Sequence, residues 1–204
     1  MTGIVAQNVG RTSGLIKSAA GGGGGAWTKI STFTSDGSDA TATFDSGIDS
    51  TYPIYVFKFI TIHPQTDDKN FQVNFRDGST AYDATKTTTY FHATHDEGDS
   101  ATSLAYIAGH DLAQSTGAQI LSEGISSDAD HGSSGALWLF SPSSTTYVKH
   151  FICRSNGTRH SDISSDVHVA GYCNVTAAID GVQFSMSSGE IQGGKIKLYG
   201  LSDS

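Results

Sequence analysis

The sequence has little cysteine and little positive charge, and each shortage excludes a class of protein. Two cysteines are too few for a disulfide framework, so Cys153 and Cys173 are expected to be inert core thiols, with a cross-strand bridge as the alternative. Twelve lysines and arginines against twenty acids give a formal net charge of −8. This balance argues against direct nucleic-acid binding, which needs a basic surface to displace counterions.

Long apolar runs are also absent. No stretch is apolar for long enough to span a bilayer, and the N-terminus lacks the charged-then-apolar pattern of a secretory signal peptide. We therefore expect synthesis in the cytoplasm and no membrane partner. What the chain does have is glycine, with 24 residues, beside a low hydrophobic content of 37%. Short strands joined by many turns would produce that mixture.

The first 25 residues differ from the rest. Residues 1–20 show neither a helical stripe nor strand alternation, and five consecutive glycines, residues 21–25, follow as a hinge or flexible tether. A frayed terminus is one interpretation. The segment is nevertheless too apolar for a solvated tail, which favours an arm that orders against a partner. The apolar residues of this assembly arm are Ile4, Val5, Val9, Leu15 and Ile16.

The end of the chain, residues 171–201, predicts a closing β-hairpin. Val182, Phe184 and Met186 alternate with polar residues, and Ile196 and Leu198 alternate with polar residues after a Ser/Gly-rich turn. A lone hairpin is marginally stable in water, so this one is expected to dock on a larger sheet.

The remainder of residues 26–204 predicts further short strands. Residues 54–62 are apolar on nearly both faces and are flanked by Pro53 and Pro64, which predicts a central strand covered on both sides. Residues 99–122 are compatible with short helical turns or irregular strands, while 126–135 and 156–166 are expected to be polar loops. The other expected strands are 27–33, 40–44, 71–75, 87–93 and 167–173, with a hairpin of 136–140 and 147–154. Together they predict an all-β domain, a β-sandwich or jelly roll, behind an extended N-terminal arm of residues 1–25.

Candidate chemical groups are few. His92 and His95 are three residues apart and would point to opposite faces of a strand, which argues against a zinc pair. Asp128, Asp130 and His131 offer loop oxygens for calcium, but the complete calcium-binding loop with its closing glutamate is missing. The sequence also lacks a G-x-S-x-G elbow and a phosphate-binding loop. We therefore expect no catalytic residues, no metal ligands and no cofactor.

Five aromatic residues have two interpretations. They fill the core or a subunit interface, which is the favoured interpretation, or they lie on an exposed face and stack on sugars. These residues are Trp27, Trp138, Tyr147, Tyr172 and Tyr199.

Four phrases resemble a family of small β-rich proteins encoded by tailed bacteriophages, notably marine ones. The phrases are GIVAQNVGRTSGLIK, GIDSTYPIYVFKFITIHPQTDDKNFQVNF, SPSSTTYVKHFICR and AIDGVQFSMSSGEIQGGKIKLYGL. The resemblance covers nearly the whole chain and is carried by the order of the phrases, without a catalytic motif. It implies a virion structural role, in capsid decoration or in the tail or its fibres.

The expected function is therefore that of a non-enzymatic virion protein that acts by assembly. Its expected partners are other virion proteins, of the capsid or the tail, and copies of itself, with a homotrimer as the preferred homo-oligomer. A tail-fibre adhesin that binds carbohydrate on the host surface is the alternative. A depolymerase with two facing carboxylates is a third interpretation.

Overall fold

The computed structural model of this chain describes residues 27–202, and every regular element among them is a β-strand. The predicted arm and glycine hinge, residues 1–25, lie outside the described residues. Within the described part no helix has the length and apolarity to cross a bilayer. The strands are β1 (Trp27–Thr34), β2 (Thr41–Phe44), β3 (Ile54–Pro64), β4 (Lys69–Arg76), β5 (Lys86–Asp96), β6 (Thr102–Tyr106), β7 (Gln119–Ile125), β8 (Ser133–Phe140), β9 (Lys149–Arg159), β10 (Ile163–Cys173), β11 (Gly181–Met186) and β12 (Ile191–Leu201).

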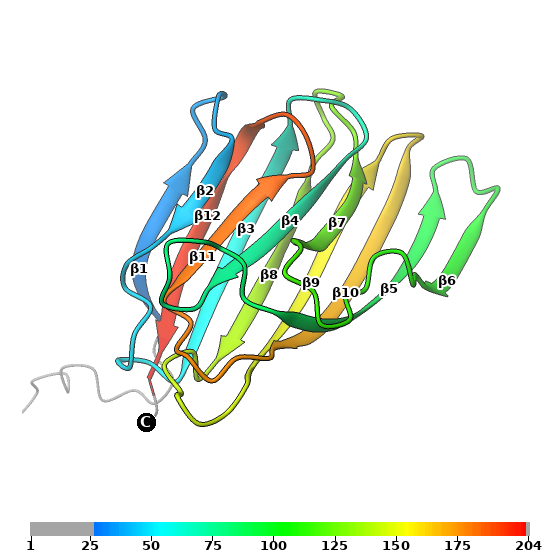
Figure 1. Cartoon of the computed structure of the whole chain (residues 1–204). Coiled ribbons are helices and arrows are strands. Elements are labelled where there is room, and N and C mark those ends of the chain that lie inside the picture. Colours follow the sequence, from blue (N-terminus) through cyan, green and yellow to red (C-terminus); the bar gives the residue numbers. More distant parts are fainter. Residues whose placement is uncertain (1–26, 203–204) are drawn as a thin grey trace, which may run out of the picture.

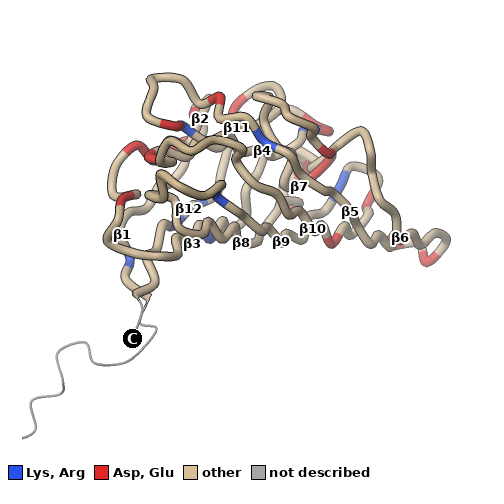
Figure 2. Tube along the Cα trace, turned by 60° about the horizontal axis from the view of Figure 1, so that its bottom comes forward, with Lys and Arg blue, Asp and Glu red and all other residues tan. Residues whose placement is uncertain are grey.

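The strands form two antiparallel layers of unequal width (Figures 1 and 2). The wide layer has the order β1-β12-β3-β8-β9-β10-β5-β6, and the narrow layer has the order β2-β11-β4-β7. One pair, Ile125 of β7 with Arg159 of β9, joins the layers along one side. The predicted all-β fold, a β-sandwich of the jelly-roll type, is confirmed.

Aromatic side chains fill the space between the layers. Phe184 of β11 stacks on Phe71 of β4 with ring centroids 5.5 Å apart. The same ring lies 5.4 Å from Phe57 of the wide layer and 6.1 Å from Phe44 of β2. Aromatic pairs at these separations add to the stabilisation from burying their apolar area. Phe184 therefore contacts both layers at once.

The closing hairpin predicted for residues 171–201 is wrong, although both of its strands exist. β11 pairs with β2 and β4 in the narrow layer, whereas β12 pairs with β1 and β3 in the wide layer. The glycine-containing connection between them, where Gly189 has a φ of 73°, carries the chain from one layer to the other. Alternation identifies the buried face of a strand and leaves its partner open. The hairpin predicted for 136–140 and 147–154 is confirmed as β8 and β9.

The polar loop predicted for residues 156–166 is also wrong. β9 continues to Arg159 and β10 begins at Ile163, so only a tight connection separates the two strands. The prediction failed because Ser155 and Ser165 are buried at inward positions that usually hold apolar side chains. At Gly157, also inward, an added Cβ would lie 2.7 Å from the Ser122 hydroxyl. Residues 99–122, left open above, contain β6 and the start of β7.

Strand β3 is central, as predicted, but is covered on one face only. It lies between β12 and β8, and Tyr55, Phe57 and Phe59 point into the core. Lys58 and Ile60 point the other way and are exposed. The prediction that both faces of this strand are covered is therefore wrong. The outer face of the wide layer is open at β3.

Phe184→Ala should destabilise the fold by about 3–5 kcal/mol, because it removes a fully buried ring and leaves a cavity between the layers. Urea unfolding followed by circular dichroism measures this change. Tyr147→Ala is the matched control, because Tyr147 is 74% exposed, and it should shift the free energy of unfolding by about 0.5 kcal/mol or less. A loss at Phe184 no larger than that of the control would contradict the role assigned to this ring.

Candidate functional site

The face of the wide layer that turns away from the narrow layer is called the open face below. Strand register aligns its side chains in rows that cross the sheet. One row contains Lys29, Tyr199, Val56, Trp138, Ile152, Ala170 and Thr89. The next row contains Thr32, Lys197, Lys58, Ala136, Arg154, His168, Phe91 and Tyr106.

Positive charge gathers on the open face of this acidic chain. From β1 through β10 of the wide layer, Asp166 is the one acid among the outward-facing strand residues of the described chain. Acidic residues lie mainly in loops and around the narrow layer (Figure 2). The basic residues of the open face are Lys29, Lys58, Lys195, Lys197 and Arg154. Although the net charge of the chain is −8, basic side chains form a stripe on the open face.

The β1 end of the open face is packed against itself. The Lys58 ammonium group lies 4.1 Å from the centre of the Trp27 ring, and Trp27 and Tyr199 meet edge to face with centroids 5.5 Å apart. Such cation–π and aromatic contacts occupy the surfaces that a ligand would use. The available part of the open face is therefore nearer its middle.

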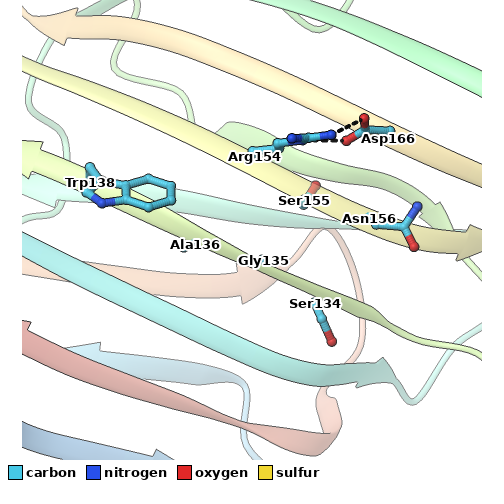
Figure 3. Close-up of a pocket in the computed structure, with 8 residues that line it drawn as sticks. All are labelled: Ser134, Gly135, Ala136, Trp138, Arg154, Ser155, Asn156 and Asp166. Atoms are coloured by element: carbon cyan, nitrogen blue, oxygen red, sulfur yellow. Dashed lines mark hydrogen bonds and ion pairs between the residues drawn. The ribbon is translucent and has the colours of Figure 1, made fainter.

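A groove of about 540 Å³ lies there, across β8, β9 and β10 (Figure 3). Trp138 stands at one end, and Ser134 and Asn156 stand at the other. Ala136 contributes only a methyl group on this face, which leaves the groove open. Arg154 donates from Nε and Nη2 to the Asp166 carboxylate at 3.1 and 2.8 Å. This hydrogen bonding, with the charge of Arg154, lowers the pKa of Asp166 and keeps that carboxyl ionised.

A second hollow of about 490 Å³ lies further along β9 and β10 on the same face. Its walls come from Tyr172 and His150, whose ring centroids are 6.0 Å apart, and from the outward threonines of β5. Ile152 and Ala170, side by side in the register, line this hollow on the side nearer the groove. Two hollows thus follow the same pair of strands.

A different cluster of polar groups is enclosed where β7 meets the wide layer. Glu123 of β7, only 5% exposed, faces His92 of β5, His110 and Arg159 of β9. Nδ1 of His110 lies 3.1 Å and Nη1 of Arg159 lies 3.0 Å from the carboxylate, and Nδ1 of His92 contacts it as well. A carboxylate only accepts hydrogen bonds, so Nδ1 of His92 and Nη1 of Arg159 donate to it, and Nδ1 of His110 lies within ion-pair distance.

The pKa of Glu123 follows from this geometry. Burial alone would raise it, but the close approach of His110 and the nearby Arg159 and His92 outweigh burial and lower the pKa below its ordinary 4.5. The carboxylate is therefore charged, paired and enclosed. Its role is to tie β7 to β5 and β9.

The residues considered for metal binding lie as follows. His92 and His95 are on opposite faces of β5, as predicted: His92 is buried at Glu123, and His95 is exposed beside Asp99. His131 lies 4.0 Å from Asp128 and 3.9 Å from Asp130 in their loop. Across residues 27–202, no three or more His, Cys, Asp or Glu side chains are arranged to hold a metal ion.

Both cysteines are free and buried, which confirms the expectation of core thiols. Burial is the main cause that raises the pKa of Cys173 to about 12, and burial also raises the pKa of Cys153. Both thiols are therefore protonated at neutral pH, which is the less reactive form.

The favoured interpretation of the five aromatic residues places them in the core or at a subunit interface; its core part is wrong, while the interface part stays a prediction. Trp27 and Tyr147 are exposed, and Trp138, Tyr172 and Tyr199 are half-buried. The signal was present in β8, where Leu137 and Leu139 point inward and Trp138 between them must point outward. The groove itself was missed, because it combines residues of three strands.

No family model, curated protein or solved structure matches the chain in any of the three comparisons.

Glu123→Gln should lower the free energy of unfolding by about 3 kcal/mol at pH 7, because it removes the buried charge that pairs with the half-buried Arg159. The lowered pKa means that ionised Glu123 stabilises the fold above pH 4.5, and that this contribution is lost as the pH falls through the folded-state pKa. The difference in free energy of unfolding between the variant and the native chain should therefore become smaller below pH 4.5. Urea titrations across pH measure it, with the exposed Glu97→Gln as control. If the difference in free energy of unfolding did not change with pH, the stabilising role of the Glu123 charge would be contradicted.

Proposed function

We propose that this chain is a non-enzymatic structural protein of a tailed-bacteriophage particle and that it acts by assembly with copies of itself and other virion proteins. The observation that carries the proposal is the ribbon formed by β5 and β6, called the β5–β6 ribbon below. The resemblance of the four sequence phrases to small phage proteins supplies the biological setting.

The β5–β6 ribbon ends the wide layer beyond the narrow one (Figure 1). β6 pairs with β5 and with no other strand of residues 27–202, so its second edge has no strand partner there. Its side chains are exposed on both faces, including Leu104 at 78% and Tyr106 at 55%. Phe91 of β5, in register with Tyr106, is 41% exposed.

An exposed strand edge beside large apolar side chains is a template for pairing with another chain. Soluble proteins usually block such an edge, and here Leu104 and Tyr106 leave it attractive to a neighbour. A closed ring of copies would cover each β6 edge with the next copy, and a homotrimer is the stoichiometry we propose. On a particle the high local concentration makes such a small contact sufficient. We also propose that residues 1–25 reach across to a neighbouring virion protein.

The double variant Leu104→Lys with Tyr106→Lys should be monomeric, because two charges on the ribbon oppose a buried contact. Light scattering after size exclusion should give about three times 21.4 kDa for the native chain and 21.4 kDa for the variant. The far-ultraviolet circular dichroism spectrum should not change. Tyr147→Lys, an equally drastic change at an exposed tyrosine outside the ribbon, should leave the oligomer intact. A monomeric native chain, or an oligomer that survives the double variant, would exclude the ribbon as the contact.

The virion assignment has its own test. Peptides of this chain should be present in purified particles of the phage that encodes it, in a fixed ratio to the major capsid protein, because an assembled component has a defined copy number. Quantitative mass spectrometry measures the ratio, and a ratio near that of the capsid protein indicates the head while a far smaller one indicates the tail. Absence of the chain from washed particles would overturn the virion role.

A further inference from the structure

We propose that the groove between Trp138 and Asn156 on the open face is a binding site for a neutral glycan. The proposal goes beyond assembly, and its evidence lies in residues that the β5–β6 ribbon does not contain.

Trp138 supplies a platform for a sugar ring. Its neighbours in the register are Val56 and Ile152, both apolar, so the indole is half-buried and held from two sides. Ala136, two residues away on β8, leaves space beside the ring on the same face (Figure 3). The C–H face of a pyranose is apolar and packs on such an aromatic ring, which offers a large rigid surface at little entropic cost.

The polar end of the groove suits the hydroxyl edge of the same sugar. Arg154 uses Nε and Nη2 on Asp166, and its Nη1 has no hydrogen-bond partner among residues 27–202. A carboxylate accepts several hydrogen bonds. Neighbouring sugar hydroxyls can therefore accept from Arg154 and donate to Asp166. The Nδ2 atom of Asn156 is held by Ser164 and Ser165, which orients its Oδ1 as a further acceptor.

The charges favour a neutral ligand. The guanidinium of Arg154 and the carboxylate of Asp166 are 2.8 Å apart, so the groove has no net charge of its own. An anionic ligand would meet the carboxylate, and a cationic one would meet the guanidinium. Uncharged hydroxyl groups, which both donate and accept, match a fixed ion pair without repulsion.

The backbone disfavours a peptide. β8, β9 and β10 each have a strand on both sides, so their amide and carbonyl groups are already paired in the sheet. An extended peptide usually gains affinity by adding to a free strand edge, and no such edge borders the groove. The groove therefore offers a ligand only side chains, on a shallow surface. Such a surface suits a carbohydrate.

The second hollow predicts a glycan of several sugars. Tyr172 lies six positions after Asp166 on β10, a span of about 20 Å along an extended strand. Tyr172 repeats the role of Trp138, and the hydroxyls of the threonines at the rim repeat the polar edge. The affinity should therefore rise with chain length until the glycan spans both hollows.

The protein's two tryptophans make a direct assay possible. In a Trp27→Phe background Trp138 is the single fluorescent indole, and its emission reports occupation of the groove. The probes are glucose, galactose and mannose oligosaccharides of increasing length, with uronic-acid oligomers as anionic probes. At least one neutral series should change the emission saturably, and its longest member should bind about tenfold more tightly than the monosaccharide.

Two variants and one control test the location by titration calorimetry. Ala136→Leu fills the groove without removing a hydrogen bond, and Trp138→Ala removes the platform; each should weaken binding about tenfold or more. Tyr147→Ala, an exposed aromatic outside the groove, should not change it. The Leu104 and Tyr106 double variant should bind the glycan normally, so failure of the assembly proposal and failure of this one are distinguishable.

Several results would overturn the site. These are no response of Trp138 to any neutral probe, binding of uronic-acid oligomers alone, or unchanged affinity in Ala136→Leu. If Trp138→Ala does not fold, Ala136→Leu and the fluorescence titration still decide the question.

Discussion

Packing of two sheets of unequal width is the constraint on which the rest of this structure depends. The phenylalanine rings between the layers exclude water from one face of each sheet, and Phe184 contacts rings on both sides. The narrow layer has too few strands to cover the wide one. Because each sheet has two faces and only one is buried in the sandwich, the wide layer presents the other face to its surroundings. The open face and the β5–β6 ribbon both follow from this mismatch.

Polar packing completes the sandwich where aromatic packing ends. At the junction of β7 with the wide layer, Glu123 accepts hydrogen bonds from His92 and Arg159 and lies within ion-pair distance of His110. A buried charge is tolerated only when it is paired and hydrogen-bonded, so these four residues form one unit. This explains how a chain with only 37% hydrophobic residues closes a large core.

The wide layer has two separate surfaces, and one of the two proposals rests on each. The β5–β6 ribbon offers an unpaired edge and apolar side chains, which favour contact with another copy. The groove offers a half-buried indole and a neutral ion pair, which favour a small polar ligand. These surfaces lie on different strands of the wide layer. The assembly proposed for the ribbon would therefore leave the groove accessible to the proposed glycan.

The sequence by itself determined the all-β class, most of the strands and the burial of both thiols, because alternation over a few residues reports which face of a strand is buried. It also separated His92 from His95 across β5. The tertiary structure alone decided that β11 and β12 belong to different layers, since alternation does not name a partner. It alone brought Glu123 to His92 and Arg159, and Trp138 to Arg154 and Asp166, because residues distant in the chain become neighbours only through strand register.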